Sequence, residues 1–221
     1  MFNGLFKRYI QFLLKKEFAN VYIRSSKTAE GPKLYVPNHS SWWDALVIYY
    51  VNAAFLREDA RGMMAEEGLK RFPFFKKIGA FPVGQSPKQQ LAAIQTAARF
   101  LQENRSVWLF AQGEERFHTV RPLQFKTGAG FLKERVPSAT LLPVAITYAF
   151  RHERKPDIFV WIGEPVHAEG DRKTVTRTLE EKVEEMLDDV THQLEQETTA
   201  GFEPLLQGKK TIDQRVERRQ P

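Results

Sequence analysis

The chain is organised around the segment Asn38-His39-Ser40-Ser41-Trp42-Trp43-Asp44. This segment follows the apolar run at residues 34–36, which predicts a short buried strand that ends at Pro37, and it precedes residues of helical character. An imidazole and a carboxylate therefore stand five positions apart where a strand gives way to a helix. Both side chains can then point into one cleft, and a histidine held by a carboxylate is a general base for a hydroxyl group.

The same pair has a purely structural interpretation. His39 would then be an ordinary loop residue, and Asp44 would be an early-helix carboxylate that faces the positive end of the helix dipole. Short motifs of this kind also arise by chance, so the rest of the chain has to decide between the two interpretations.

Composition narrows the class of protein. The 221 residues are 42% hydrophobic, which suits one fairly large domain with its own core. There is no cysteine, so disulfides, thiol nucleophiles and Cys-ligated zinc are excluded. The net charge of +6 favours an anionic partner such as a phospholipid surface or an acidic carrier. Nucleic acid is not expected as a partner, because the basic residues are spread out and no binding motif occurs.

Residues 1–20 predict an N-terminal amphipathic helix. Such a helix can lie in a membrane interface with its basic side in water, or it can pack its apolar face on the core of the protein. No apolar run approaches the roughly 20 residues that span a bilayer. We therefore expect peripheral or monotopic association with the cytoplasmic face of a membrane. At about 100° per residue, the expected apolar face comprises Phe2, Leu5, Phe6, Tyr9, Ile10, Phe12 and Leu13.

Strand-like and helix-like segments alternate after residue 20. This alternation predicts an α/β fold in which a mixed sheet is flanked by helices. The main domain is expected over residues 21–200, and residues 201–221 are expected to form a polar, basic tail. Strands are expected at 21–23, 34–36, 62–65, 79–83, 106–110, 140–149 and 158–162, and helices at 42–52, 68–77, 87–103, 125–135 and 174–197.

Further short blocks follow the first one in order along the chain. Residues 79–85 read Gly-Ala-Phe-Pro-Val-Gly-Gln, and residues 110–116 read Phe-Ala-Gln-Gly-Glu-Glu-Arg. Residues 125–130 read Phe-Lys-Thr-Gly-Ala-Gly, and residues 142–144 read Leu-Pro-Val. With these blocks the chain resembles the glycerolipid acyltransferase superfamily, which includes the lysophosphatidate acyltransferases.

The resemblance implies roles for the first block. Residues 38–44 match the family's Asn-His-x-Ser-x-x-Asp form in full. In that family the histidine is the catalytic base and the aspartate is its partner, so these roles would fall to His39 and Asp44. The expected reaction moves a fatty acyl group from a thioester, on coenzyme A or on an acyl carrier protein, to a lipid hydroxyl. No cofactor and no metal is implied.

The second and third blocks depart from the family pattern. Gln85 stands where the family has an arginine thought to hold the acceptor's phosphate. The third block is usually Phe-Pro-Glu-Gly-Thr-Arg, but here Gln112 replaces the glutamate and Arg116 lies one position late. A glutamine lacks the charge and the fork with which arginine binds phosphate. A neutral or glycosylated hydroxyl acceptor, or an unusual lysolipid, is therefore expected near Gln85, Gln112, Gly113, Glu114 and Arg116.

Two features of this prediction remain open. Arg116 or Lys126 can still bind a phosphate, which would make the protein a lysophosphatidate acyltransferase of phospholipid synthesis, and a catalytically inactive lipid-binding relative is the other alternative. The oxyanion of the reaction needs donors, and the backbone near Gly113, the loop amides of Ser40 and Ser41, and Lys126 are candidates. Ser41 also has a simpler interpretation, as the cap of the following helix.

Overall fold

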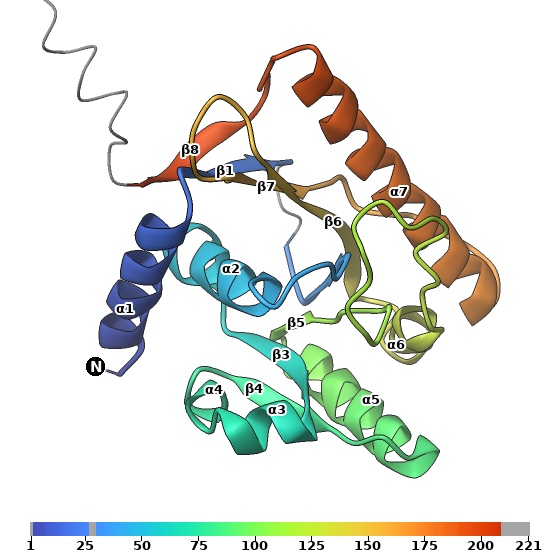
Figure 1. The fold of residues 1–221 in the computed structure, drawn as a ribbon. Helices are drawn as coiled ribbons and strands as arrows, with labels where there is room; N and C mark the ends of the chain where they lie inside the picture. Colours follow the sequence, from blue (N-terminus) through green and yellow to red (C-terminus); the bar gives the residue numbers. More distant parts are fainter. Residues whose placement is uncertain (1, 27–29, 209–221) are drawn as a thin grey trace, which may run out of the picture.

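The computed structural model describes residues 2–26 and 30–208. Within these residues, eight strands form one sheet in the order β4-β3-β5-β2-β6-β7-β1-β8 (Figure 1). The pairs β6–β7 and β1–β8 are antiparallel, and the other neighbours are parallel. The strands are β1 Asn20–Ser25, β2 Lys33–Pro37, β3 Ala60–Ala65, β4 Ala80–Val83, β5 Ser106–Trp108, β6 Thr140–Ala149, β7 Asp157–Ile162 and β8 Glu203–Gln207.

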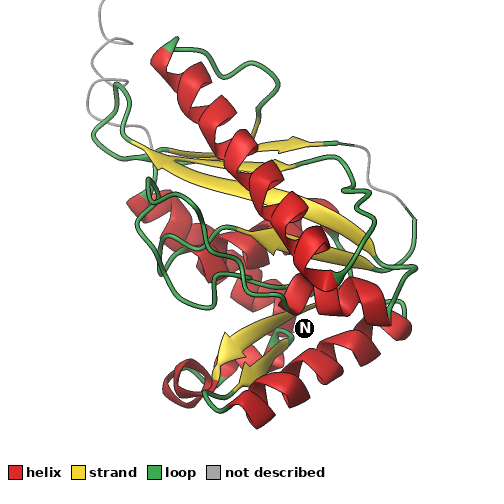
Figure 2. Cartoon of the chain, turned by 90° about the vertical axis from the view of Figure 1, so that its right-hand side faces the viewer, coloured by secondary structure: helices red, strands yellow, loops and turns green. Residues whose placement is uncertain are grey.

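Helices cover both faces of this mixed sheet, which confirms the predicted α/β fold. Two of them, α1 and α2, pack on one face, while α5, α6 and α7 pack on the other, which the long α7 crosses (Figure 2). The helices are α1 Phe2–Glu17, α2 Asp44–Val51, α3 Glu66–Arg71, α4 Phe74–Lys77, α5 Pro87–Gln102, α6 Gly128–Arg135 and α7 Arg172–Glu195, and α2 continues into the π-helical turn η1 Asn52–Leu56.

Strand β2 lies near the middle of the sheet and is buried along its whole length. Successive side chains of a strand point to opposite faces, so Tyr35 joins the core under α1 and α2, while Leu34 and Val36 join the core under α5–α7. Burial on both faces explains the uninterrupted apolar run. The parallel strands β2, β3 and β5 end at the same edge, and ligands of open α/β sheets bind outside that edge.

The N-terminal helix α1 has apolar residues both in the core and at the surface. Phe6, Ile10 and Leu14 are buried in the core. Leu5 and Tyr9 are 65% and 53% exposed, and Phe12 next to them is 52% exposed. The helix thus packs on the domain with one side and keeps an apolar stripe at the surface. Across residues 2–26 and 30–208, no helix has both the length and the hydropathy needed to cross a bilayer.

The expected tail at 201–221 is wrong in its first part. Glu203–Gln207 forms β8, which pairs antiparallel with β1, and the neighbouring side chains of Phe202 and Leu206 are buried. These apolar side chains, set among polar ones, complete the edge of the sheet beside β1. The sheet therefore continues past residue 200, and residues 209–221 lie outside the described part of the chain.

Candidate active site

Asn38 sets the direction in which the chain leaves β2. It is 1% exposed, and its side chain forms two hydrogen bonds with the backbone of Ile146 in β6. The amide nitrogen donates to the carbonyl oxygen over 3.0 Å, and the Ile146 N–H donates to the amide oxygen over 2.7 Å. An asparagine fits here because one side chain offers both a donor and an acceptor. The pairing of β2 with β6 is thereby extended by a side chain, and His39 starts from a fixed position.

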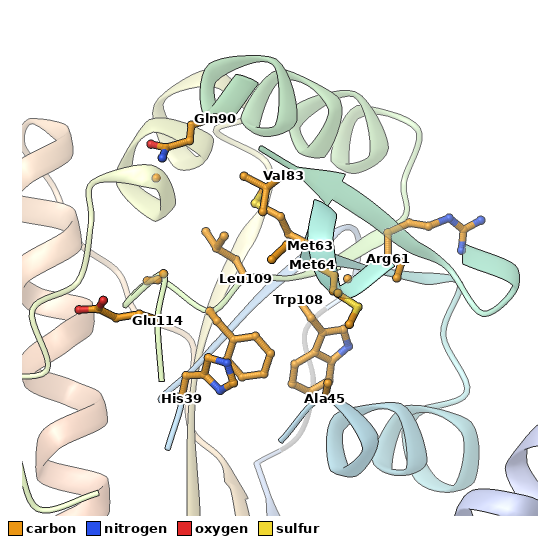
Figure 3. Close-up of a pocket in the computed structure, with 18 of the residues that line it drawn as sticks. His39, Ala45, Arg61, Met63, Met64, Val83, Gln90, Trp108, Leu109 and Glu114 are labelled. Carbon is orange, nitrogen blue, oxygen red and sulfur yellow. The ribbon is translucent and has the colours of Figure 1, made fainter. Parts of the chain in front are cut away.

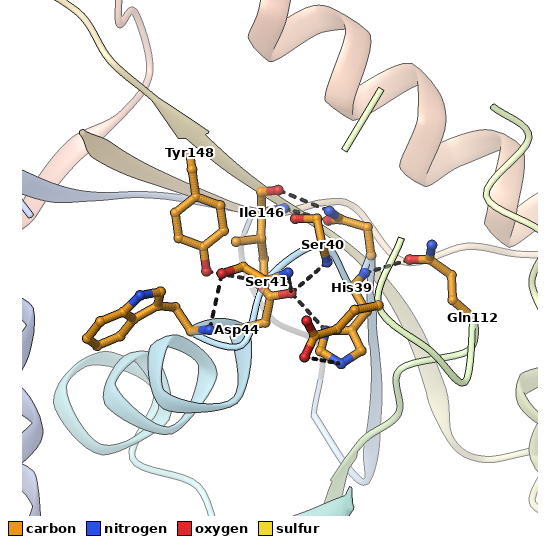
Figure 4. Close-up of polar contacts among 10 residues, drawn as sticks. His39, Ser40, Ser41, Asp44, Gln112, Ile146 and Tyr148 are labelled. Atoms are coloured by element: carbon orange, nitrogen blue, oxygen red, sulfur yellow. Dashed lines mark hydrogen bonds and ion pairs between the residues drawn. The ribbon is translucent and has the colours of Figure 1, made fainter. Parts of the chain in front are cut away.

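The His39 imidazole and the Asp44 carboxylate meet as the sequence predicts (Figure 4). Nδ1 of His39 lies 2.9 Å from Oδ2 of Asp44, which is fully buried at the start of α2. The carboxylate accepts hydrogen bonds from its other partners, so Nδ1 is the donor in this pair. Nε2 is then the ring nitrogen that Asp44 does not bind, and His39 lines the cavity described below.

Ser40 and Ser41 serve Asp44 rather than a reacting oxyanion. Their backbone N–H groups donate to Oδ2 over 2.7 Å and 2.9 Å. An N–H group used in this way cannot stabilise an oxyanion, so the expected role of these two amides is wrong. The hydroxyl of Ser41 accepts from the N–H of Trp43 over 3.2 Å, and the helix itself begins at Asp44. The loop is a tight cradle for one carboxylate.

Tyr148 in β6 completes the surroundings of Asp44. Its hydroxyl donates to Oδ1 over 2.6 Å. Burial, reinforced by the neighbouring Asp44 carboxylate, raises the pKa of Tyr148 well above its ordinary value, so the phenol keeps its proton and remains a donor. The sequence contains no signal for this contact, because the two residues stand 104 positions apart.

Gln112 is a structural clamp on His39 and does not face an acceptor. It is 1% exposed, and its side-chain oxygen accepts from the backbone N–H of His39 over 2.5 Å. The N–H of Arg116 donates to the carbonyl of His39 over 2.9 Å, and the ring of Phe110 stacks on the imidazole at 4.2 Å. The loop after β5 therefore holds the histidine on three sides. The expected acceptor-binding role of Gln112 is corrected accordingly.

A cavity of about 1110 Å³ opens beside His39 and runs between α2 and strands β3 and β5 (Figure 3). Of the residues predicted for the site, Gln85, Gly113, Glu114 and Lys126 line it together with His39. Arg116 is absent from the described lining, since its guanidinium donates to Gln124 and Glu114 instead. The apolar part of the lining includes Ala45, Ile48, Met63, Met64, Phe75 and Trp108.

Charged groups surround the cavity next to His39. Oε1 of Glu115, a residue that the sequence analysis did not single out, lies 4.0 Å from Nε2. Lys126 lies along Gly113, where an added Cβ would stand 2.6 Å from its Nζ. Gly113 also has a φ of 74°, a conformation that other residues rarely adopt. The only sequence signal for Glu115 is that it and Glu114 stand near the positions where the family has Thr-Arg.

Comparisons with known proteins identify the family and the fold of this chain. The family model described as Acyltransferase matches residues 18–147, more than half of the chain. A similar solved structure is the crystal structure of the 1-acyl-sn-glycerophosphate (LPA) acyltransferase PlsC from Thermotoga maritima. It has a TM-score of 0.64 and 17% sequence identity, with 86% of this chain and 81% of that chain covered. This likeness shows a shared fold. None of the curated proteins matches the chain.

The clamp assigned to Gln112 can be tested by stability. Replacing it in Gln112→Ala leaves the partly buried N–H of His39 without its acceptor, so the free energy of unfolding should fall by about 1–3 kcal/mol. Urea denaturation followed by circular dichroism measures this change. Gln90→Ala is the matched control, because Gln90 lies at the cavity but is exposed. Equal stability of the two variants would show that the contact does not contribute to the free energy of unfolding.

Proposed function

The chain belongs to the acyltransferase family, and we propose that it moves a fatty acyl group from a thioester donor to a lipid hydroxyl. The observation that carries the proposal is a histidine, oriented by a buried carboxylate, at the side of a large apolar cavity. The donor would be acyl-CoA or an acylated carrier protein. PlsC of Thermotoga maritima, which shares the fold, is an acyltransferase of a 1-acyl-sn-glycerophosphate, and this supports a lipid acceptor.

The proposed reaction uses His39 as general base. Nε2 takes the proton of the acceptor hydroxyl while that oxygen attacks the thioester carbonyl carbon. The tetrahedral intermediate then collapses, the carbon–sulfur bond breaks, and the imidazolium returns the proton to the leaving thiolate. Asp44 holds the ring in place and stabilises its positive charge, as the carboxylate of a catalytic triad does. The acceptor supplies the nucleophile, so the enzyme needs no serine of its own.

Lys126 is the proposed electrostatic partner of the oxyanion. It lines the cavity next to Gly113, and this loop is tied to His39 through the contacts of Gln112 and Arg116. A fixed positive charge close to the developing negative charge lowers the barrier most effectively in a site from which water is excluded. The amides of Ser40 and Ser41 are already used by Asp44, and the N–H of Gly113 donates to the carbonyl of Phe110 over 3.1 Å, so we propose Lys126 as the donor.

The apolar part of the cavity is the proposed place of an acyl chain. It extends from His39 between α2 and the strands β3 and β5, towards Ala60 and Arg61 at the other end of β3. Its lining of methionine, aromatic and aliphatic side chains suits a flexible hydrocarbon. Gly62 lies in the middle of this lining, and an added Cβ there would meet open space. The size of residue 62 should therefore limit the length of the chain that fits.

The apolar stripe of α1 is the proposed contact with the membrane. Leu5, Tyr9 and Phe12 are exposed on one side of the helix, and Lys16 continues this side by one turn. Apolar side chains flanked by basic ones bind at the headgroup boundary of an anionic bilayer. The cytoplasmic leaflet carries such negative charge, so we place the protein peripherally on that face. The acceptor lipid would then be reached without leaving the membrane surface.

The base is tested with His39→Ala. Loss of the general base should lower the rate of acyl transfer by about 10²–10⁴-fold in an assay with radiolabelled acyl-CoA or acyl carrier protein and a panel of lipid acceptors. His167→Ala replaces an exposed histidine and should retain full activity. Unchanged transfer by His39→Ala would refute the mechanism. Absence of transfer by the wild type with every donor and acceptor would favour the inactive lipid-binding alternative.

The acyl cavity is tested with Gly62→Leu. The new side chain fills space between α2 and β3, so the preferred donor should become shorter by several carbons while the melting temperature stays nearly unchanged. Gly62→Ala serves as a graded control and should shift the profile less. Competition between acyl donors of increasing length measures the preference. An identical length profile in all three proteins would place the acyl chain elsewhere.

The membrane contact is tested by replacing Leu5, Tyr9 and Phe12 together with glutamine. Removing three apolar side chains from the interface should weaken binding to phosphatidylglycerol vesicles by about tenfold or more. Co-sedimentation with vesicles measures the partition. A control variant with Val120→Gln and Phe150→Gln removes exposed apolar surface from other segments and should bind normally. Equal binding of the two variants would contradict the role of the stripe.

A further inference from the structure

Glu115 lies next to the nitrogen atom that the acceptor hydroxyl has to approach. Its Oε1 lies 4.0 Å from Nε2 of His39, the nitrogen left over after Nδ1 is bonded to Asp44. Glu115 lines the cavity, and its side chain is 52% exposed, so a ligand can reach it. A hydroxyl that bonds Nε2 must come within about 3 Å of that atom. Groups on neighbouring carbons of the acceptor then lie within reach of this carboxylate.

Two carboxylates, Glu114 and Glu115, line the cavity on this side, whereas the arginines of the lining, Arg61, Arg71 and Arg172, come from β3, α3 and α7. Glu114 also lines the cavity, and it binds Arg116 over 2.6 Å, which holds the guanidinium in contact with Glu114 and Gln124. Gln85 occupies the position of the family's phosphate-binding arginine, and its amide donates to Glu67 over 3.2 Å. Lys126 is a cation of the same cavity lining, which also contains the carboxylates of Glu114 and Glu115.

A carboxylate next to the base discriminates between head groups. It accepts hydrogen bonds from hydroxyl groups, and it repels a phosphate held a few ångströms away. We propose that Glu115 is an acceptor-binding residue: it accepts a hydrogen bond from a second hydroxyl of an uncharged lipid head group, such as a glycerol or a sugar, and it disfavours acceptors with a phosphate beside the reacting hydroxyl. This inference rests on the proposed acyl transfer, because it assumes that the acceptor meets His39.

This preference has a different basis from the one that the sequence suggests. Gln112 is buried in its contact with His39, so it does not select the head group. The selection falls instead to a charge that the third block carries at position 115. The acceptor thus bridges two groups, with one hydroxyl on Nε2 of His39 and the next one on the carboxylate of Glu115.

The decisive experiment compares Glu115→Gln with the wild type on two acceptors of equal chain length, a monoacylglycerol and lysophosphatidate. We expect the wild type to favour the uncharged acceptor in kcat/KM by at least about tenfold, the effect of one nearby like charge. Glu115→Gln should reduce this ratio by about tenfold, mainly through a lower KM for lysophosphatidate. Glu203→Gln, an exposed carboxylate on β8, is the matched control and should leave the ratio unchanged. An unchanged ratio in Glu115→Gln, or a wild type that prefers lysophosphatidate, would overturn the inference.

A binding measurement separates this inference from the proposed function. Decyl glucoside and decyl phosphate, both below the concentration at which they form micelles, are titrated into wild type and Glu115→Gln and followed by calorimetry. Tighter binding of the glucoside in the wild type, with the difference lost in Glu115→Gln, supports the role of Glu115 even if no acyl transfer is found. If the ratio of the two dissociation constants is the same in the wild type and in Glu115→Gln, the inference is overturned. Tighter binding of decyl phosphate than of decyl glucoside, lost in Lys126→Ala, would also overturn it and would assign the site to a phosphate acceptor.

Discussion

The fully buried carboxylate of Asp44 is the group on which the geometry of the site depends. A buried carboxylate is costly unless hydrogen-bond donors surround it. In the described part of the chain, four donors do so: Nδ1 of His39, the N–H groups of Ser40 and Ser41, and the hydroxyl of Tyr148. They come from the loop after β2 and from β6. These hydrogen bonds hold the loop in a conformation that brings the imidazole to the carboxylate, so the packing of the domain orients the base.

Two buried amides connect this loop to the rest of the sheet. Asn38 replaces a backbone pairing between β2 and β6, and Gln112 binds the backbone of His39 from the loop after β5. Both polar atoms of the Asn38 amide and the side-chain oxygen of Gln112 are used in these contacts. This explains how the third sequence block can depart from the usual family pattern while the pair His39–Asp44 stays in place: the glutamine supplies the acceptor that the N–H of His39 requires. The substitutions change the charge of the third block, but the hydrogen bonds that hold His39 remain.

The site is also divided by polarity, and each side suits one part of the proposed reaction. On one side, the cavity between α2 and the strands β3 and β5 is lined mainly by apolar groups, which suit a hydrocarbon chain. On the other side, Glu115 lies 4.0 Å from the reactive Nε2, and Glu114 and Lys126 line the same cavity. His39 stands between the two, with Phe110 stacked on its ring. An acyl chain and a polar head group can thus approach the same atom from different surroundings.

Local sequence patterns were sufficient to predict the α/β class, most strands and helices, and the meeting of His39 with Asp44. In each case the signal lies within a few residues: an apolar run, a helical stripe, or a spacing of five along one loop. Four features depend on contacts between distant segments, namely the hydroxyl of Tyr148 on Asp44, the clamp by Gln112, the position of Glu115 beside Nε2, and the pairing of β8 with β1. Gln112 is 73 positions from the residue it binds, and Tyr148 is 104 positions from Asp44. No periodicity spans such separations, because the partners are brought together by the order of the strands in the sheet and by the burial of their polar groups.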